Sequence, residues 1–207
     1  MLVPKKKIPV IAIDGPSSSG KGTIARQVAH TLHFHLLDSG ALYRLVALKV
    51  AREGRVQGTE PEIAQIAANL DVRFSTNDAL KEQVWLSGEE VCQKIRTEEC
   101  GRLASTIAAL PMVREALLKI QKGFRQSPGL VADGRDMGTT VFPEAILKIF
   151  LTASVEDRAR RRLNQLKDKG IDVSLAALSR DIEDRDRRDS DRPVAPLRQA
   201  DDARFLD

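Results

Sequence analysis

A stretch near the amino terminus, "GPSSSGKGT" at residues 15–23, combines flexible backbone, four hydroxyls and a lysine. Gly15 and Gly20 would let the chain curl so that consecutive N–H groups point inward, which makes a nest for an anion where a helix begins. Lys21 would add a positive charge for the β- and γ-phosphates of a nucleotide. Residues 15–23 therefore predict a binding loop for nucleotide phosphates.

This loop departs from the common pattern GxxxxGK[ST] at one position. The common pattern has Ser or Thr directly after the lysine, whereas here Gly22 follows and the hydroxyl comes at Thr23. The form "GKGT" resembles that of nucleoside monophosphate kinases, and Thr23 can still face the phosphates or the Mg²⁺ shell. Nothing in the sequence reads as NKxD, the guanine-selecting element of GTPases. We expect ATP to bind Gly15, Pro16, Ser17, Ser18, Ser19, Gly20, Lys21, Gly22 and Thr23, with Thr23 as the metal-binding residue.

Two further segments place polar residues after expected strands. In "LLDSGALYR", Arg44 is suited to a second phosphate because a guanidinium binds phosphate oxygens bidentately. Ser39 in the same segment could bind a ligand, cap the following helix, or do both. In "VADGRDMGTTVFP", Asp133, Arg135 and Asp136 come just after an apolar run, where charge is costly without partners. Both segments predict ligand contacts at strand ends.

The charge of the chain favours a small anion over a nucleic acid. The net charge is +4 and the pI is near 9.2, but arginines and aspartates alternate in "RDIEDRDRRDSDR". Segments that bind polymer phosphate usually carry charge of one sign. Aromatic residues make up 4% of the chain, which leaves little material for stacking on bases. We therefore expect small-molecule partners and no nucleic acid.

The bulk properties fit one domain that works in a reducing compartment. A chain of 207 residues with 42% hydrophobic residues can bury its own core. Cys92 and Cys100 are expected to be free thiols. The start "MLVPKKKIPVIAIDG" reads as a first strand that continues into the loop, and no apolar stretch reaches the ~18 residues of a membrane span. We expect a cytoplasmic protein with no membrane partner.

Apolar runs and helical patterns alternate along the chain. Short buried strands are expected at 9–13, within "HFHLLDSG", "GLVADG" and "AILKIFLTA", and at "ARFLD". Helices are expected at 21–33, 41–54, 61–69, 95–110, 111–125, 155–169 and 174–187, with Ser154 and Asp157 as a capping box. Strand-like pieces at 72–75, 83–86 and 91–93, separated by Asn-Asp and Ser-Gly turns, predict a small antiparallel insert. The fold class is therefore α/β, with three layers around a parallel sheet that binds ligands at its carboxyl end.

Four segments together resemble the bacterial-type cytidylate kinase family. They are "IDGPSSSGKGT", "LLDSGALYR", "VADGRDMGTTVFP" and "RDRRDSDRPVAPL", in the order and spacing of that family, and the likeness runs from Pro9 nearly to Asp207. The resemblance implies a P-loop kinase fold and transfer of the γ-phosphoryl group of ATP to CMP or dCMP with Mg²⁺. It also implies one domain over 1–207, with an acceptor-binding insert at about 65–110 and a short lid at about 155–172. The family's pattern continues with a helix after "FLD", where this sequence stops.

The resemblance assigns roles to residues at matching positions. The acceptor phosphate would be bound by Ser39, Arg44, Arg135 and Arg192, the cytosine by Ser105, Arg114 and Asp136, and the pentose by Arg185 and Asp189. Arg158 and Arg162 would belong to the lid over ATP. The catalytic set would be Lys21, Arg135, Arg158, Arg162 and Arg192.

Two alternatives remain open from the sequence. The first is a related kinase that acts on UMP, dTMP or AMP. Cytosine shows an amino donor beside two acceptors, so a carboxylate paired with an arginine would select it over uracil. The second alternative is a nucleotide-dependent switch or a nucleic-acid-binding protein.

Of these possibilities we expect a kinase, and we expect it to be a monomer.

Overall fold

The structure is a computed structural model that describes residues 7–76, 82–168 and 170–207. The chain forms two compact units. One unit contains the residues up to 38 together with 121–207, and the other contains residues 39–120. The boundary after residue 38 falls within the segment "LLDSGALYR", so the expected site residues are divided between the units.

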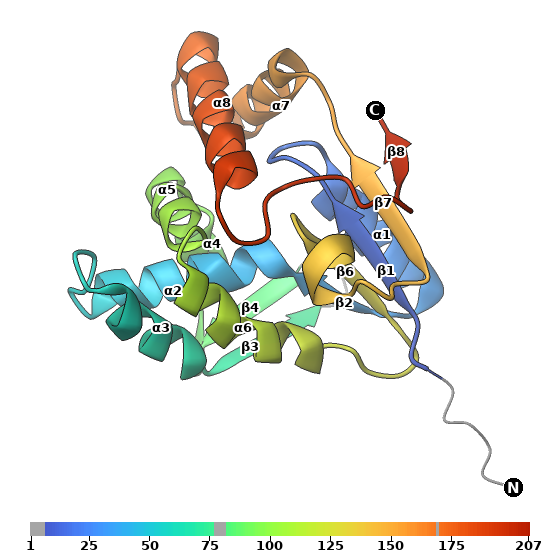
Figure 1. The fold of residues 1–207 in the computed structure, drawn as a ribbon. Helices are drawn as coiled ribbons and strands as arrows, with labels where there is room; N and C mark the ends of the chain where they lie inside the picture. The colour runs from blue at the N-terminus through green and yellow to red at the C-terminus, as the bar shows by residue number, and fades with distance from the viewer. Residues whose placement is uncertain (1–6, 77–81, 169) are drawn as a thin grey trace, which may run out of the picture. The chain divides into compact units, whose positions relative to one another are not determined.

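A five-stranded parallel sheet forms the centre of the first unit (Figure 1). Its strands are β1 (Val10–Asp14), β2 (His35–Asp38), β6 (Leu130–Gly134), β7 (Leu147–Leu151) and β8 (Arg204–Leu206), and their order is β2-β6-β1-β7-β8. Every residue of β1 and β6 is buried, as expected for a parallel strand with neighbours on both edges. Because all pairs are parallel, Asp14, Asp38 and Gly134 end at the same edge of the sheet.

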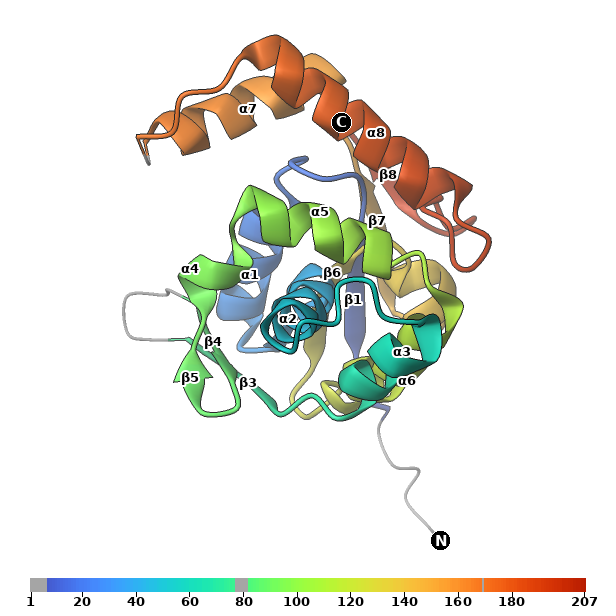
Figure 2. The same ribbon diagram turned by 90° about the vertical axis from the view of Figure 1, so that its left-hand side faces the viewer.

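Helices of the first unit pack on this sheet and on each other. Helix α1 (Lys21–Leu32) buries Ala25 and Ala29 against Ile11, Ile13 and Val131 of the sheet. Helices α7 (Val155–Lys167) and α8 (Leu175–Asp191) lie side by side (Figure 2). Their shared core consists of Ala159, Leu166, Leu178 and Ile182. A short π-helix, η1 (Met137–Val141), follows β6.

The second unit is built around helix α2 (Ser39–Arg52), which buries eight of its residues. Helix α3 (Glu60–Ala68) begins with a capping box, in which the backbone N–H of Thr59 donates to Glu62. Strands β3 (Val72–Thr76), β4 (Glu82–Leu86) and β5 (Glu89–Glu90) form an antiparallel sheet, and helices α4 (Cys92–Ile95), α5 (Glu98–Ile107) and α6 (Pro111–Gly123) follow. The last residues of α6 belong to the first unit.

The expected antiparallel insert is confirmed, but its third strand was misplaced. Residues 91–93 do not form a strand, since β5 ends at Glu90 and its side chain accepts from the N–H of Cys92, where α4 begins. The Ser87-Gly88 turn is confirmed, with φ values of 50° and 81°. The expected Asn-Asp turn lies at residues 77–78, outside the described residues.

One expected helix is divided in two. Residues 95–110 do not form a continuous helix, because Thr97 interrupts it and accepts from the N–H of Cys100 as the N-cap of α5. Ser154 is the N-cap of α7 as expected: its hydroxyl accepts from the N–H of Asp157 and donates to Oδ2 of the same residue. Helix α8 extends four residues beyond the expected end at Arg187.

The expected fold class is confirmed by a parallel central sheet with helices around it and a separate small antiparallel sheet. Cys92 and Cys100 are free thiols, as expected. Among the helices of the described residues, none has the length and apolar character needed to cross a membrane.

Candidate active site

The glycine-rich loop lies between β1 and α1. A side chain at Gly15 would place its Cβ 1.9 Å from the carbonyl oxygen of Leu151 in β7, so only glycine allows this approach to the sheet. Gly20 is the N-cap of α1 with φ 96°, a conformation that glycine adopts without strain. The loop therefore ends at the positive end of a helix, where free N–H groups attract an anion.

Lys21 is held inside this loop. Its side chain is 8% exposed, its Nζ donates to the carbonyl oxygen of Pro16 at 2.8 Å, and Nζ lies 4.0 Å from Oδ1 of Asp133. Burial, together with the charge of Arg135, lowers the pKa of Lys21 to about 8, against the opposing effect of Asp133. The charged form of Lys21 is therefore destabilised in the folded protein, and the negative phosphates of a nucleotide would stabilise it.

Two hydroxyls of the loop, those of Ser17 and Ser19, are buried without a hydrogen-bond partner among the described residues. A buried hydroxyl without a partner costs free energy. Phosphate oxygens would satisfy both groups.

Thr23, the expected metal-binding residue, has its hydroxyl 3.4 Å from NH2 of Arg26, which donates to it, and a carboxylate lies near its neighbour Gly22. A Cβ at Gly22 would lie 3.1 Å from Oδ2 of Asp133, so this carboxylate closely approaches the residue before Thr23. Burial raises the pKa of Asp133 even though Lys21 lowers it, so the carboxylate would gain from a nearby cation. Across the described part of the chain, no three His, Cys, Asp or Glu side chains gather as a metal site.

Arginines from α7 reach the loop. Arg158 is 4% exposed; its NH1 donates to the carbonyl oxygen of Ser17 at 3.3 Å and its NH2 lies 2.6 Å from Oδ2 of Asp186 in α8. Arg161 donates to the carbonyl oxygen of Ser19 at 2.9 Å. Arg162 NH1 donates to Oε1 of Gln165 on the same helix at 3.1 Å. Arg158, one of the expected lid arginines, therefore contacts the loop, and so does Arg161.

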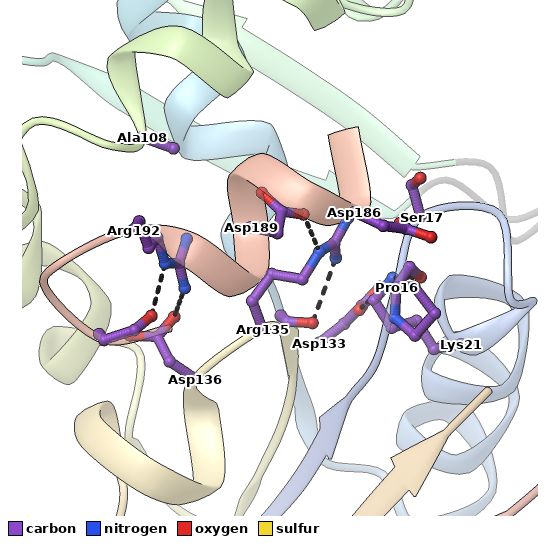
Figure 3. Close-up of polar contacts among 12 residues, drawn as sticks. Pro16, Ser17, Lys21, Ala108, Asp133, Arg135, Asp136, Asp186, Asp189 and Arg192 are labelled. Carbon is purple, nitrogen blue, oxygen red and sulfur yellow. Dashed lines mark hydrogen bonds and ion pairs between the residues drawn. The ribbon is translucent and has the colours of Figure 1, made fainter. Parts of the chain in front are cut away.

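A largely buried ion pair joins Arg135, the residue after β6, to α8. Arg135 Nε donates to Oδ2 of Asp189 at 2.8 Å, with side chains 16% and 7% exposed (Figure 3). Burial alone would raise the pKa of Asp189, but Arg135 and Arg185 outweigh it and the pKa is lowered. The carboxylate therefore stays ionised and keeps the arginines in place.

A second buried contact links Asp136 with the segment after α8. Arg192 NH2 lies 3.5 Å from Oδ1 of Asp136, and both side chains are 3% exposed (Figure 3). Arg192 Nε also donates to the carbonyl oxygen of Ala195 at 2.5 Å. Two expected acceptor residues from distant parts of the sequence thus contact each other.

The second unit contains the other four expected acceptor residues. Arg44 donates to the carbonyl oxygens of Ile95 and Thr97 at 2.6 and 3.2 Å, so it spans the turn between α4 and α5. Arg114 donates to the carbonyl oxygen of Ala108 at 3.2 Å, and its guanidinium lies 5.6 Å from the ring centre of Tyr43. Ser39 and Ser105 are buried at 3% and 4% exposure.

The sequence patterns assign no role to four charged residues of the first unit: Asp14, Asp133, Arg161 and Asp186. The only signal for Asp133 is its place at the end of an apolar run. Arg161 and Arg162 stand three and four residues after Arg158, so both share its helix face and the spacing could not choose between them. No sequence signal marked Asp186 within its run of alternating charges.

A phosphate loop between β1 and α1 of a parallel sheet, with arginines that contact its carbonyls, defines the class of P-loop kinases. A family model described as cytidylate kinase matches residues 11–207. The chain therefore belongs to the cytidylate kinase family, and it is a kinase.

Curated relatives agree with this family over nearly the whole chain. A cytidylate kinase of Nitrosococcus oceani is 56% identical over 203 residues, which cover 98% of this chain and 89% of that protein. A cytidylate kinase of Pseudomonas paraeruginosa is 57% identical over 97% of this chain and 88% of that protein. One of Cupriavidus necator is 58% identical over 96% and 87%, respectively.

Proposed function

We propose that this enzyme transfers the γ-phosphoryl group of ATP to CMP or dCMP, giving CDP or dCDP and ADP. The observation that carries the proposal is the buried Lys21 beside the unpartnered hydroxyls of Ser17 and Ser19, in a chain of the cytidylate kinase family. These groups need an anion, and the triphosphate of ATP supplies it. ATP binds residues 15–23.

Mg²⁺ is the expected cofactor. Thr23 holds it through its hydroxyl, and the nearby carboxylate of Asp133 is the second candidate oxygen. When bound, the ion neutralises the charge that develops on the β- and γ-phosphates. The enzyme's own residues bring the phosphates to this position.

Each compact unit contains some of the residues proposed to bind the acceptor. Ser39, Arg44, Ser105 and Arg114 belong to residues 39–120, and Arg135, Asp136, Arg185, Asp189 and Arg192 belong to the other unit. Asp136 accepts a hydrogen bond from the amino group of cytosine, and Arg114 donates to the ring acceptors. Uracil reverses this polarity at two positions, so the same pair disfavours it.

Positioning and charge stabilisation supply the catalysis. Lys21, Arg135, Arg158, Arg162 and Arg192 are the proposed catalytic cations. A single transition-state arginine is worth roughly 10³–10⁵ in rate for phosphoryl transfer. Arg158 is already ordered by Ser17 and Asp186, so less entropy is lost when it meets the nucleotide.

An acceptor comparison tests the function. ADP release is measured by a coupled assay with ATP and, in turn, CMP, dCMP, UMP, dTMP and AMP, with and without EDTA. CMP or dCMP should give the highest kcat/KM, and EDTA should abolish turnover. A higher kcat/KM with UMP, dTMP or AMP would assign the chain to a different acceptor.

The remaining expectations concern organisation and location. We propose that the enzyme acts as a monomer in the cytoplasm, which suits its free thiols. Residues of about 65–110 serve as the acceptor-binding insert and residues of about 155–172 as the lid. Size-exclusion chromatography with light scattering tests the monomer, and cell fractionation tests the location.

A further inference from the structure

Asp14, the last residue of β1, makes a contact that none of the expected roles includes. It is 5% exposed. Its Oδ1 accepts from the N–H of Met137 and its Oδ2 accepts from the N–H of Gly138, both at 2.8 Å. Both oxygens of one buried carboxylate are thus used on the first turn of η1.

This contact anchors the chain just beyond the proposed acceptor residues. Gly134, the last residue of β6, pairs with Asp14 in the sheet register, and Met137 is held by the Asp14 side chain. Only Arg135 and Asp136 lie between these two anchors. The backbone of both residues is therefore fixed from β1 on either side.

The anchor is strong because each group needs the other. The first N–H groups of a helical turn have no partner within it, and a buried carboxylate is costly without donors. Burial raises the pKa of Asp14 to about 6, against the lowering effect of the two N–H groups and of Lys21, and with Asp136 adding to the rise. The Lys148 side chain packs beside Gly138 on the same turn.

We propose that Asp14 is a positioning residue for the acceptor, which fixes Arg135 and Asp136 relative to the phosphate loop that begins one residue later at Gly15. The proposal rests on the assignment of Arg135 and Asp136 to CMP. Asp14 itself touches neither nucleotide. It acts through the backbone of η1.

Asp14→Asn is the main test. Asparagine has nearly the same size but only one acceptor oxygen, so its side-chain NH₂ would face one of the two backbone N–H groups, donor against donor. We expect the CMP KM to rise about tenfold, as loss of one charge-assisted hydrogen bond implies, while the Kd for ADP changes less than twofold. Hydrogen exchange at the amides of Met137 and Gly138 should become faster. A merely structural role would weaken both nucleotides together.

Glu144→Gln is the matched control, since it removes one carboxylate that pairs with Arg125 a few residues past η1. This variant should leave the CMP KM and the Kd for ADP unchanged. Asp14→Glu is the second variant, because it keeps the charge but lengthens the side chain by one methylene at a position that is 5% exposed, so the carboxylate can no longer meet both N–H groups in the same place. It should raise the CMP KM several-fold with little change in the Kd for ADP, and it decides the question if Asp14→Asn does not fold.

The outcomes separate this inference from the proposed function. A wild-type enzyme that prefers another monophosphate refutes the CMP assignment, and the variants are then measured with that acceptor. Acceptor KM values within twofold of wild type in the folded variants would overturn the role of Asp14. Equal losses for acceptor and ADP would overturn it as well.

Discussion

Replacing Lys21 by Met should strongly reduce turnover and stabilise the substrate-free protein. Burial lowers the pKa of Lys21 from 10.5 to about 8, so its charge costs the folded state about 3 kcal/mol at pH 7. Methionine removes this cost but also removes the hydrogen bond to Pro16, worth about 1 kcal/mol. The free energy of unfolding should therefore rise by about 1–2 kcal/mol, and Tm by a few degrees.

The pH dependence of this difference has a definite sign. The pKa of Lys21 is lower in the folded state, so between about pH 8 and 10.5 the unfolded state binds more protons. The free energy of unfolding of the wild type therefore increases relative to that of the variant as pH rises through this window. The stability advantage of Lys21→Met should be largest below pH 8 and should disappear toward pH 10.5.

Turnover should fall by about 10³. A unit charge about 4 Å from a phosphate is worth about 4 kcal/mol at an effective dielectric constant of 20. Urea unfolding at several pH values gives the stability, and the coupled ADP assay gives the activity. Lys122→Met, at an exposed position, should change neither.

Two results would refute this reasoning about Lys21. A Lys21→Met protein that is less stable than wild type by more than ~1 kcal/mol at pH 7 would mean that burial does not strain the lysine. A folded variant with near-wild-type turnover would remove Lys21 from the donor site.

Three further predictions concern the acceptor side and the lid. Asp136→Ala should lower the CMP-to-UMP ratio of kcat/KM far more than it alters the KM for ATP, and an unchanged ratio would remove Asp136 from base recognition. A double-mutant cycle of Arg135→Met and Asp189→Asn should give a coupling of about 1.5–3 kcal/mol in urea unfolding at pH 7, whereas additivity would contradict the buried ion pair. Because the pKa of Asp189 is lowered from 3.8, this coupling should be complete above about pH 4 and lost as pH falls further. CMP and ATP together should protect residues 158–192 from hydrogen exchange more than either alone; equal protection with and without ligands would indicate a rigid lid.

Local features of the site could be predicted from the sequence. The loop at residues 15–23 needs only a strand before it, a helix after it and glycine where the backbone turns, and all three are readable in consecutive residues. The capping of α7 by Ser154 is equally local. The helix expected over 95–110 was wrong because the N-cap at Thr97 competes with helical propensity at a single residue.

The sequence by itself determined the phosphate loop, the alternation of strands and helices, and the family to which the motifs belong. Only the tertiary structure decided which charged groups meet: Asp14 binds an N–H group 123 residues away, and Arg135 pairs with Asp189, 54 residues away. The tertiary structure also shows that Arg161 contacts the loop. The sequence could not predict this, because helical spacing places Arg161 and Arg162 equally on the face of Arg158. The physical reason is range. Backbone propensities act between neighbours in the chain, whereas ion pairs and buried hydrogen bonds form only after the sheet register and the packing of α7 and α8 have brought distant residues together.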